Sequence, residues 1–369
     1  MNICYVCNEY PPRAHGGIGT FVSSMAHAMA RAGHHVVVVQ LGVSNSERVD
    51  GVVHVVTLKA SASILHPLTN RLRLYSWLRN AVRNGSVEII EVPDYQGLLP
   101  FWFPYCPVVV RLHQSSATYA RIFGGCVFCG YWIAEKGTLA FHRRWISVSQ
   151  WMLDYTCSTF NLRPKKSSVI MNPVTIKPGN VTTPPLPECF IVAVGYVGER
   201  KGSYVLAEAV AELLKDRQEM HLVYVGAIQD AMAKDKIYAI LGPSLSKKVH
   251  FVGWLDHSVT LSSIAKAKVF VLPSRAESFG LVALEAMAMG VPVVFTNFGP
   301  GPEVVTDGKT GLLVDPYSPE DIKTKIHLIL DDKGLADDLI RNGKCDIEKR
   351  FSVEQCRSQT EEFYRTCLG

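Results

Sequence analysis

The sequence predicts an α/β fold of two doubly wound domains that face each other across a cleft. Three observations lead to this prediction. At 369 residues the chain is too long for one ordinary domain and about right for two. Short apolar stretches alternate with stretches of helical periodicity, which is typical of βαβ units on a parallel sheet. A stretch rich in Pro, Thr and Gly at residues 175–188 separates two such series and predicts a linker.

The first series predicts a domain over residues 1–175. Its apolar stretches have the length of buried strands, and its helical stretches gather apolar side chains on one face. In chain order we expect a strand at 2–7, a helix at 20–31, strands at 35–40 and 52–57, a helix at 68–83, and strands at 87–92 and 108–112.

The second series predicts a domain over residues 176–350. Its expected strands lie at 189–194, 221–225, 249–252, 269–272 and 291–295. The last predicted helix, at 353–366, has no strand after it, so we expect residues 351–369 to cross back and brace the first domain. Doubly wound domains bind ligands at the carboxyl ends of their strands, so the chemistry is expected in the loops that follow them.

Composition narrows the function classes. Hydrophobic residues make up 48% of the chain, and the net charge of +5 is spread over 38 basic and 33 acidic side chains without a long basic block. This pattern argues against a nucleic-acid partner. Ten cysteines without a regular framework, and no secretory segment after Met1, predict reduced thiols and a cytoplasmic location.

Two other features are judged weak. Cys126 and Cys129 form a C-x-x-C without a second pair, so ordinary packing is favoured over a metal or redox role. The apolar stretch at 98–110 is too short for a membrane helix and is interrupted by prolines, so no membrane span is expected.

The most informative stretch follows the predicted strand at 269–272. Ser278 is expected to cap a helix over residues 279–289, with Gly290 ending it. Glu285 then lies inside an apolar helix, where a carboxylate is costly to bury unless donors such as two ribose hydroxyls bind it.

Glu277 stands just ahead of this predicted helix. A helical rise of about 1.5 Å per residue would place it roughly 10 Å from Glu285, which is close to the separation of a nucleotide's ribose and the sugar beyond its diphosphate. The free amides of Gly280 and Leu281 would lie between the two carboxylates and could hold phosphate oxygens.

Two Glu residues at this spacing, set in E-S-F-G-L-V-A-L-E-A-M-A-M-G-V-P-V-V, resemble the signature of glycosyltransferase family 4. The resemblance covers the whole chain and is densest at residues 192–315. It implies a GT-B fold and retaining transfer of a hexose-type sugar from a nucleotide diphosphate donor, with UDP-sugars favoured and GDP-mannose as the alternative. The acceptor would be a hydroxyl of a glycan, a glycolipid or a small molecule, in polysaccharide or glycoconjugate biosynthesis.

The resemblance also assigns a basic residue after the predicted strand at 189–194. Lys201 matches the family lysine that neutralises the donor diphosphate, and a fixed ammonium there favours departure of the nucleotide. The sequence departs from the family at Tyr196, where many members carry Arg. Arg200 is the candidate to supply that charge, and an exposed basic turn is the competing interpretation.

The loop at residues 11–19 resembles the family's first glycine loop. Gly16 and Gly17 are the residues expected to let the backbone approach the donor phosphate. A dinucleotide fingerprint is disfavoured because the first Gly comes nine residues after Cys7 and the second strand ends in Gln40 rather than in an acid.

His113 directly follows the predicted strand at 108–112. The resemblance implies that it contacts the donor sugar near the reacting carbon, and a structural loop histidine is the alternative. Asn172 resembles the family's interdomain Asn, although the Asp that often follows is absent.

The chain contains no D-x-D pair, so we expect neither a divalent metal nor another cofactor. Lys201, Arg200 and helix amides would neutralise the diphosphate instead. Three apolar pieces of the first domain are acceptor candidates: residues 98–106, residues 122–132, and the basic helix with Leu72, Leu74, Trp77 and Leu78. Ordinary packing is the favoured interpretation of all three, and contact with a lipid-linked acceptor or the inner face of a membrane is the alternative.

Two other function classes stay open at this point. One is a sugar-nucleotide epimerase or hydrolase of the same architecture, which would turn over without an acceptor. The other is a nucleotide-sugar-binding protein without catalysis, and the joint presence of His113, Lys201, Glu277 and Glu285 argues against it.

Overall fold

The chain forms two compact units, each built around its own sheet. Unit 1 comprises Met1–Pro173 and Phe351–Gly369, and unit 2 comprises Val174–Arg350. The sequence predicts these boundaries at 175/176 and 350/351. The computed structural model describes residues 1–12, 16–62, 66–176, 181–228 and 231–369. Part of the predicted linker, residues 177–180, therefore lies outside the described residues.

Unit 1 contains an eight-stranded sheet with the order β3-β4-β2-β1-β5-β6-β7-β8, parallel except for β3. Its strands are β1 Asn2–Val6, β2 His35–Gly42, β3 Ser46–Asp50, β4 Val53–Lys59, β5 Ile89–Pro93, β6 Val108–Leu112, β7 Arg144–Ser147 and β8 Lys166–Val169. The chain runs to one side of β1 through β2 and β4, and to the other side from β5 onward. The sheet therefore has its topological switch point between β1 and β5.

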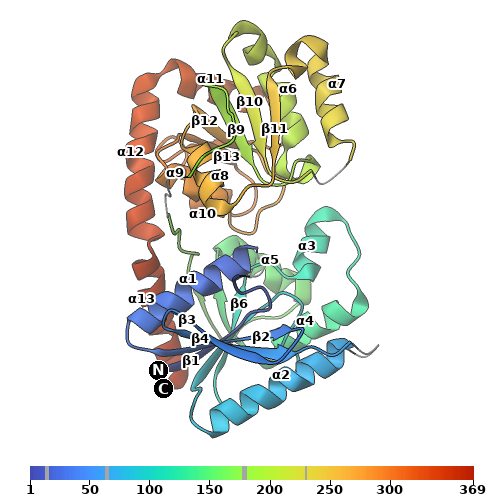
Figure 1. The fold of residues 1–369 in the computed structure, drawn as a ribbon, viewed down its shortest axis with the longest axis vertical. Helices are drawn as coiled ribbons and strands as arrows, with labels where there is room; N and C mark the ends of the chain where they lie inside the picture. Colours follow the sequence, from blue (N-terminus) through green and yellow to red (C-terminus); the bar gives the residue numbers. More distant parts are fainter. Residues whose placement is uncertain (13–15, 63–65, 177–180, 229–230) are drawn as a thin grey trace. The chain divides into compact units, whose positions relative to one another are not determined.

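Helices cover both faces of this sheet (Figure 1). They are α1 Gly17–Arg31, α2 His66–Arg83, α3 Ser116–Phe123, α4 Cys129–Phe141, α5 Gln150–Phe160 and α13 Val353–Leu368. Helices α1 and α13 share one apolar core with the face of β1 and β2 that carries Ile3, Tyr5, Val36 and Val38. Because parallel crossovers are right-handed, α2 to α5 cover the other face.

The C-terminal helix α13 is tied to unit 1 by a buried polar network. Tyr364 donates its hydroxyl to Glu91 Oε2 at 2.6 Å, and Arg111 Nε lies 2.8 Å from Glu91 Oε1. Arg111 also reaches the Thr360 hydroxyl at 3.2 Å. Glu91 is on β5 and Arg111 on β6, so the helix at the end of the chain braces the two strands that precede the predicted site of unit 1.

Unit 2 contains a six-stranded parallel sheet with the order β11-β10-β9-β12-β13-β14. Its strands are β9 Phe190–Val194, β10 His221–Val225, β11 Val249–Gly253, β12 Val269–Leu272, β13 Val293–Thr296 and β14 Leu312–Val314. The chain leaves β9 toward β10 on one side and returns to β12 on the other. The switch point of this sheet therefore lies between β9 and β12.

Helices cover both faces of the unit 2 sheet as well (Figure 1). They are the 3-10 turn η1 Glu199–Lys201, α6 Ser203–Asp216, α7 Ala233–Ser246, α8 His257–Ile264, α9 Leu281–Ala288, α10 Gly301–Val304, α11 Pro319–Asp331 and α12 Lys333–Arg350. Residues of α6, α7 and α11 form one core with the central strands. Crossovers through α8, α9 and α10 run the other way and cover the opposite face.

Candidate functional site

The switch point of the unit 2 sheet brings Lys201 and Glu277 together. The loops after β9 and β12 meet at Gly202, which has φ +70, and a Cβ there would lie only 2.1 Å from the Pro273 carbonyl oxygen. This contact therefore requires glycine. The Lys201 Nζ then lies 2.6 Å from Glu277 Oε1, although the two residues are 76 positions apart. The Lys201 and Glu277 side chains are 15% and 8% exposed, so the two charges form a largely buried ion pair.

Helix α9 follows Glu277 but begins later than the sequence predicts. The expected cap at Ser278 and start at residue 279 are wrong, since α9 begins at Leu281 with Gly280 as its N-cap in a left-handed conformation. A Cβ at Gly280 would lie 2.5 Å from the Phe295 ring, so glycine is required by packing as well as by its φ of +95. The helical rise therefore spans only part of the distance from Glu277 to Glu285.

This geometry still places backbone donors near the ion pair. Gly280 and Leu281 begin α9, and the first amides of a helix have no intrahelical acceptor. Glu285 lies one helical turn after Leu281 on the same face. Its side chain is 13% exposed, whereas its neighbours Leu284 and Ala286 are fully buried. Amide donors and a carboxylate thus line one partly open side of α9.

Glu285 has a partner that sequence reasoning missed. His257 Nε2 lies 2.7 Å from Glu285 Oε1, and this hydrogen bond raises the pKa of His257 above its usual value. His257 is the first residue of α8 and follows β11. The sequence did contain a signal for His257, because it is a histidine that comes shortly after a predicted strand. His113 was selected partly because it also follows a strand.

Arg200 packs beside the position at which the family pattern has arginine. Its guanidinium carbon lies 5.7 Å from the centre of the Tyr196 ring, a cation–π arrangement. Its carbonyl oxygen accepts a hydrogen bond from the Arg275 amide at 3.0 Å, which joins the loops after β9 and β12. A positive charge is therefore present next to Tyr196, on the loop that carries Lys201.

His113 lies at the carboxyl end of β6 in unit 1. It is 7% exposed, its ring meets the Phe21 ring edge-on at 4.9 Å, and its amide donates to Asp94 Oδ1 at 3.0 Å. Burial and the nearby Arg111 charge lower the pKa of His113 to about 3. The imidazole is therefore neutral at physiological pH, and it can donate or accept a hydrogen bond without carrying charge.

Two buried carboxylates that the sequence analysis did not select hold this part of unit 1. Asp94 follows β5 and accepts hydrogen bonds from the amides of His113 and Gln114. Burial raises the pKa of Asp94 to about 7. Glu135 of α4 accepts from the amides of Ser116 and, at its other oxygen, Ala117, at 2.7 and 3.0 Å. These carboxylates fix the loop after β6, to which His113 belongs.

Gly16 and Gly17 begin α1 after β1, on the other side of the switch point from Asp94, and both are exposed. Residues 13–15 of the predicted glycine loop lie outside the described residues. Gly16 has a φ of −100, and a Cβ there would only make ordinary contact with Glu9 at 3.6 Å. Glu9 also accepts from the Gly19 amide at 3.0 Å. The fold of unit 1 therefore does not itself require glycine at position 16.

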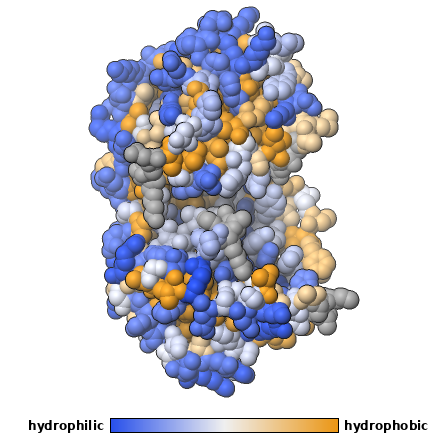
Figure 2. Space-filling view, in the orientation of Figure 1, coloured by the Kyte–Doolittle hydropathy of each residue, from blue (hydrophilic) through white to orange (hydrophobic). Residues whose placement is uncertain are grey.

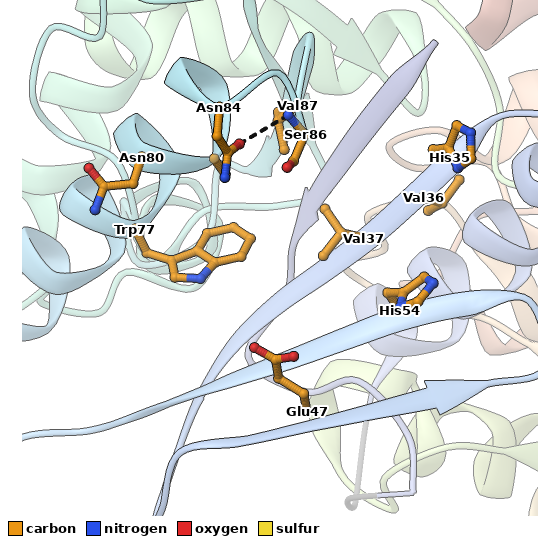
Figure 3. A pocket seen from close by; sticks show the side chains of 11 residues that line it. His35, Val36, Val37, Glu47, His54, Trp77, Asn80, Asn84, Ser86 and Val87 are labelled. Carbon is orange, nitrogen blue, oxygen red and sulfur yellow. Dashed lines mark hydrogen bonds between the residues drawn. The ribbon is translucent and has the colours of Figure 1, made fainter.

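Among the hollows in the described part of unit 1, two differ in character. One hollow has a volume of about 500 Å³. It is lined by the polar residues Gln114, Ser115 and Ser116, which follow His113 in the sequence, and by several aromatic side chains. The other, of about 420 Å³, lies between α2 and the edge of the sheet, where Trp77 faces Val37 (Figure 3). Its lining includes His35 at the start of β2 and Val87 just before β5. This second hollow is thus at the opposite end of the strands from His113.

The structure also describes Asn172, the two cysteines of the C-x-x-C, and the groups that could bind a metal or cross a membrane. Asn172 is buried at 5% exposure, and its side-chain oxygen has no hydrogen-bond partner among the described residues. Cys126 and Cys129 are exposed free thiols. Within the described ranges, no group of three His, Cys, Asp or Glu side chains is gathered as for a metal ion. No helix in the described part of the chain is both long and apolar enough to cross a membrane.

Comparison with known proteins decides the family. The pattern described as "Glycosyl transferases group 1" matches residues 180–346, and that of "Glycosyltransferase Family 4" matches residues 15–177. The chain belongs to glycosyltransferase family 4. An uncharacterized glycosyltransferase of Methanocaldococcus jannaschii is 24% identical and aligns over 100% of this chain and 99% of its own.

Solved structures support the same fold for this family 4 glycosyltransferase. Sucrose-phosphate synthase from Thermosynechococcus elongatus has a TM-score of 0.77 at 22% identity, covering 99% of this chain and 98% of its own. The Anabaena protein HepE, in complex with UDP and glucose, has a TM-score of 0.74 at 18% identity, covering 99% and 100%. The predicted GT-B fold, with two Rossmann-like units in one chain, is confirmed. That the units face each other across a cleft stays a prediction.

Proposed function

We propose that this glycosyltransferase transfers a hexose-type sugar, with retention of anomeric configuration and without a divalent metal, from a nucleotide diphosphate donor to an acceptor hydroxyl. The observation that carries the proposal is the Lys201–Glu277 ion pair at the switch point of unit 2, next to the first amides of α9. Doubly wound sheets bind nucleotides at this place. UDP-sugars are the favoured donors, since a relative of the same fold is described with UDP and glucose, and GDP-mannose is the alternative.

Lys201 acts on the donor diphosphate. A buried ammonium is costly without a partner, so the 2.6 Å contact with Glu277 keeps Lys201 charged and fixed before the donor arrives. Negative charge develops on the leaving phosphate in the transition state, and a preorganised cation stabilises that charge most. Glu277 then holds a hydroxyl of the donor sugar next to the same phosphate, with Arg200 as a second positive charge.

Glu285 binds the ribose of the donor. Its carboxylate accepts hydrogen bonds from the two ribose hydroxyls, and the 2.7 Å contact with His257 keeps it oriented toward the open side of α9. The amides of Gly280 and Leu281 bind phosphate oxygens, because a helix N-terminus carries partial positive charge. Gly16 and Gly17 of unit 1 are proposed to let the backbone approach the donor phosphates, which would account for glycine at position 16, where the fold does not require it.

Unit 1 supplies His113 and the acceptor site. The neutral imidazole contacts the donor sugar near the reacting carbon without opposing the positive charge that develops on the ring. The aromatic hollow that begins at Gln114 is the place for the acceptor. No metal is needed in this scheme, since Lys201, Arg200 and the α9 amides neutralise the diphosphate. The leaving phosphate takes the proton of the acceptor hydroxyl on the same face of the sugar.

A thermal-shift screen of UDP-, GDP- and ADP-sugars in excess EDTA tests the proposal. A donor at about 100 times its Kd stabilises the folded chain by about 2.7 kcal/mol, so one class should raise Tm clearly without metal. Absence of a shift with every donor would contradict the donor site, and a shift that needs magnesium or manganese would contradict metal independence. Turnover without an acceptor would favour an epimerase or hydrolase, and a bound donor that never turns over would favour a binding protein.

A further inference from the structure

The net charge of the chain is concentrated in one part of unit 1. Residues 61–150 contain nine Lys and Arg and four Asp and Glu, and nine minus four gives +5, which equals the net charge of the whole chain. The remaining residues are therefore neutral in sum. The sequence still contains no long basic block, since these nine bases are scattered over ninety residues.

Burial makes the surface of this segment still more basic. Three of its four acidic side chains, Glu91, Asp94 and Glu135, are buried at 3% exposure or less. Only one of its nine bases, Arg111, is buried to that degree, and it pairs with Glu91. Among the described residues of the segment, eight basic side chains thus remain at least partly exposed against one acid, Glu88.

The same segment exposes large apolar side chains. Trp102 is 65% exposed and Phe128 is 72% exposed. Other exposed apolar side chains in the segment 61–150 are Leu68, Leu72, Tyr105, Ile133 and Phe141. Figure 2 shows hydrophobic side chains gathered at the side of unit 1 where α3 and α4 lie in Figure 1. Leu74 and Leu78 of α2 are buried, so only part of the predicted basic helix packs in the core.

These elements form one continuous surface. Tyr75 of α2 donates its hydroxyl to the Trp102 carbonyl at 3.2 Å, and Arg83 stacks on Tyr105 at 5.3 Å. Residues 98–106 also contact α4, because His142 at the end of α4 has its Nε2 3.0 Å from the Phe101 carbonyl oxygen. We call the surface of α2, residues 98–106 and α4 the basic-aromatic face.

We propose that the basic-aromatic face docks on the surface of an anionic phospholipid bilayer. Exposed Arg and Lys side chains are attracted to anionic headgroups, and Trp, Phe, Leu and Ile side chains insert at the boundary of the acyl chains. A nucleic acid would bind the basic side chains of this face but would not use its exposed aliphatic side chains, so it accounts for only part of the surface. On the face itself the charge comes from Arg71, Arg73, Arg79 and Arg83 of α2 and from Lys136 of α4, all at least partly exposed. The face therefore combines the charge and the apolar groups that bilayer binding needs.

The position of the face gives docking a consequence for the reaction. Phe128 belongs to the segment that leads into α4 and also lines the aromatic hollow, which begins at Gln114 next to His113. Docking therefore holds the entrance of this hollow at the bilayer surface. The consequence rests on the proposed function, because it concerns the acceptor, whereas docking itself does not depend on the donor or on turnover.

Co-sedimentation with vesicles tests docking in the absence of any donor. The full chain should bind vesicles of mixed phosphatidylcholine and phosphatidylglycerol, should not bind phosphatidylcholine alone, and should dissociate at high salt because screening weakens exposed charges. Equal binding to both kinds of vesicle, or binding to neither, would overturn the proposal. A chain that binds RNA but not anionic vesicles would also overturn it.

Matched variants locate the surface. Arg73→Glu combined with Arg83→Glu should lower vesicle affinity by about tenfold or more, since each lost base weakens headgroup attraction. Trp102→Ser with Ile133→Ser should weaken binding at low salt as well. The controls are Arg341→Glu, whose side chain is 70% exposed, and Leu328→Ser, 43% exposed, both in unit 2. Circular dichroism confirms folding, and equal losses in the controls would contradict the assigned face.

Discussion

At the scale of single residues, the Lys201–Glu277 ion pair is the centre of the proposed donor site. Lys201→Ala should lower kcat by about a hundredfold or more, as loss of a preorganised electrostatic partner commonly does. Glu285→Ala should instead raise the donor Kd with a smaller change in kcat, because it removes ribose binding. Steady-state kinetics with calorimetric donor titration separates the two effects.

Lys323→Ala on α11 is the control for this comparison, since Lys323 also pairs with carboxylates but lies away from the switch point. Its kinetics should match the wild type. Near-wild-type kcat and Kd in both Lys201→Ala and Glu285→Ala would contradict the assigned roles. Glu277 is 8% exposed and loses its partner in Lys201→Ala, so Tm must be measured to separate lost folding from lost catalysis.

Asp94 predicts a pH dependence of stability. Its pKa rises from 3.8 to about 7 on folding because the carboxyl group is buried. The folded state therefore binds more protons between these values, and the free energy of unfolding should fall as pH rises from about 4 to 7. Asp94→Asn keeps an acceptor for the His113 amide but does not titrate.

The comparison of Asp94→Asn with the wild type isolates this group from all others. Relative to the wild type, the variant should gain stability as pH rises from 4 to 7, by an amount on the order of a few kcal/mol, and should gain no more above that range. Urea unfolding at several pH values measures it. A difference between the two proteins that does not change with pH would show that folding leaves the pKa of Asp94 at its ordinary value.

The sequence predicted the positions of the candidate site residues better than it predicted their contact partners. Lys201, Glu277, Glu285 and His113 were chosen from motifs, and the structure places each after a strand or on the helix expected. The contact between Lys201 and Glu277 depends on the approach of Gly202 to Pro273, which lies between residues far apart in sequence. Partners such as Asp94, Glu135 and His257 were missed because isolated polar residues carry no family motif, although His257 follows a strand through a short loop.

At the scale of elements, the start of α9 is set by packing as well as by the N-cap. Gly280→Ala should destabilise unit 2 by about 1–3 kcal/mol and weaken donor binding, because a Cβ would meet the Phe295 ring at 2.5 Å and the left-handed φ disfavours it. Gly308→Ala is the matched control, with a φ of +68 and nothing within 4 Å of its Cβ.

Thermal unfolding and donor titration of both variants separate the cost of the left-handed backbone conformation from the cost of the steric clash with Phe295. Gly308→Ala should lose only about 1 kcal/mol and keep donor affinity, since it carries the conformational cost alone. If the two variants lose equal stability and both retain donor affinity, the packed start of α9 is not what holds the phosphate-binding amides in place.

The strands that sequence reasoning predicted are those with continuous apolar runs. β6, β10 and β12 lie where they were expected, because burial on both faces leaves a readable pattern in parallel strands. β7 and β8 were missed, since they begin with Arg144 and Lys166 and have only four residues each. β3 is an exposed antiparallel strand at the sheet edge, and β14 has three residues, so neither shows enough periodicity.

At the scale of the whole molecule, the chain consists of two doubly wound units with different tasks. Unit 2 carries the ion pair and helix amides of the proposed donor site, and unit 1 carries His113, the aromatic hollow and the basic-aromatic face. The C-terminal helix α13 holds β5 and β6, the strands that precede His113 in the sequence, through the hydrogen bonds of Tyr364 and Arg111 with Glu91. The central claim is that these groups carry out a retaining transfer.

The anomeric configuration of the product tests this claim most directly. If the donor is held as proposed, protein covers the face of the sugar opposite the leaving phosphate, so the acceptor hydroxyl must attack on the phosphate's own side. NMR of the purified product, after transfer from an α-linked nucleotide sugar, should therefore show the coupling of an α-linkage. A β-linked product would contradict the retaining mechanism and the roles given to Lys201, Glu277 and His113.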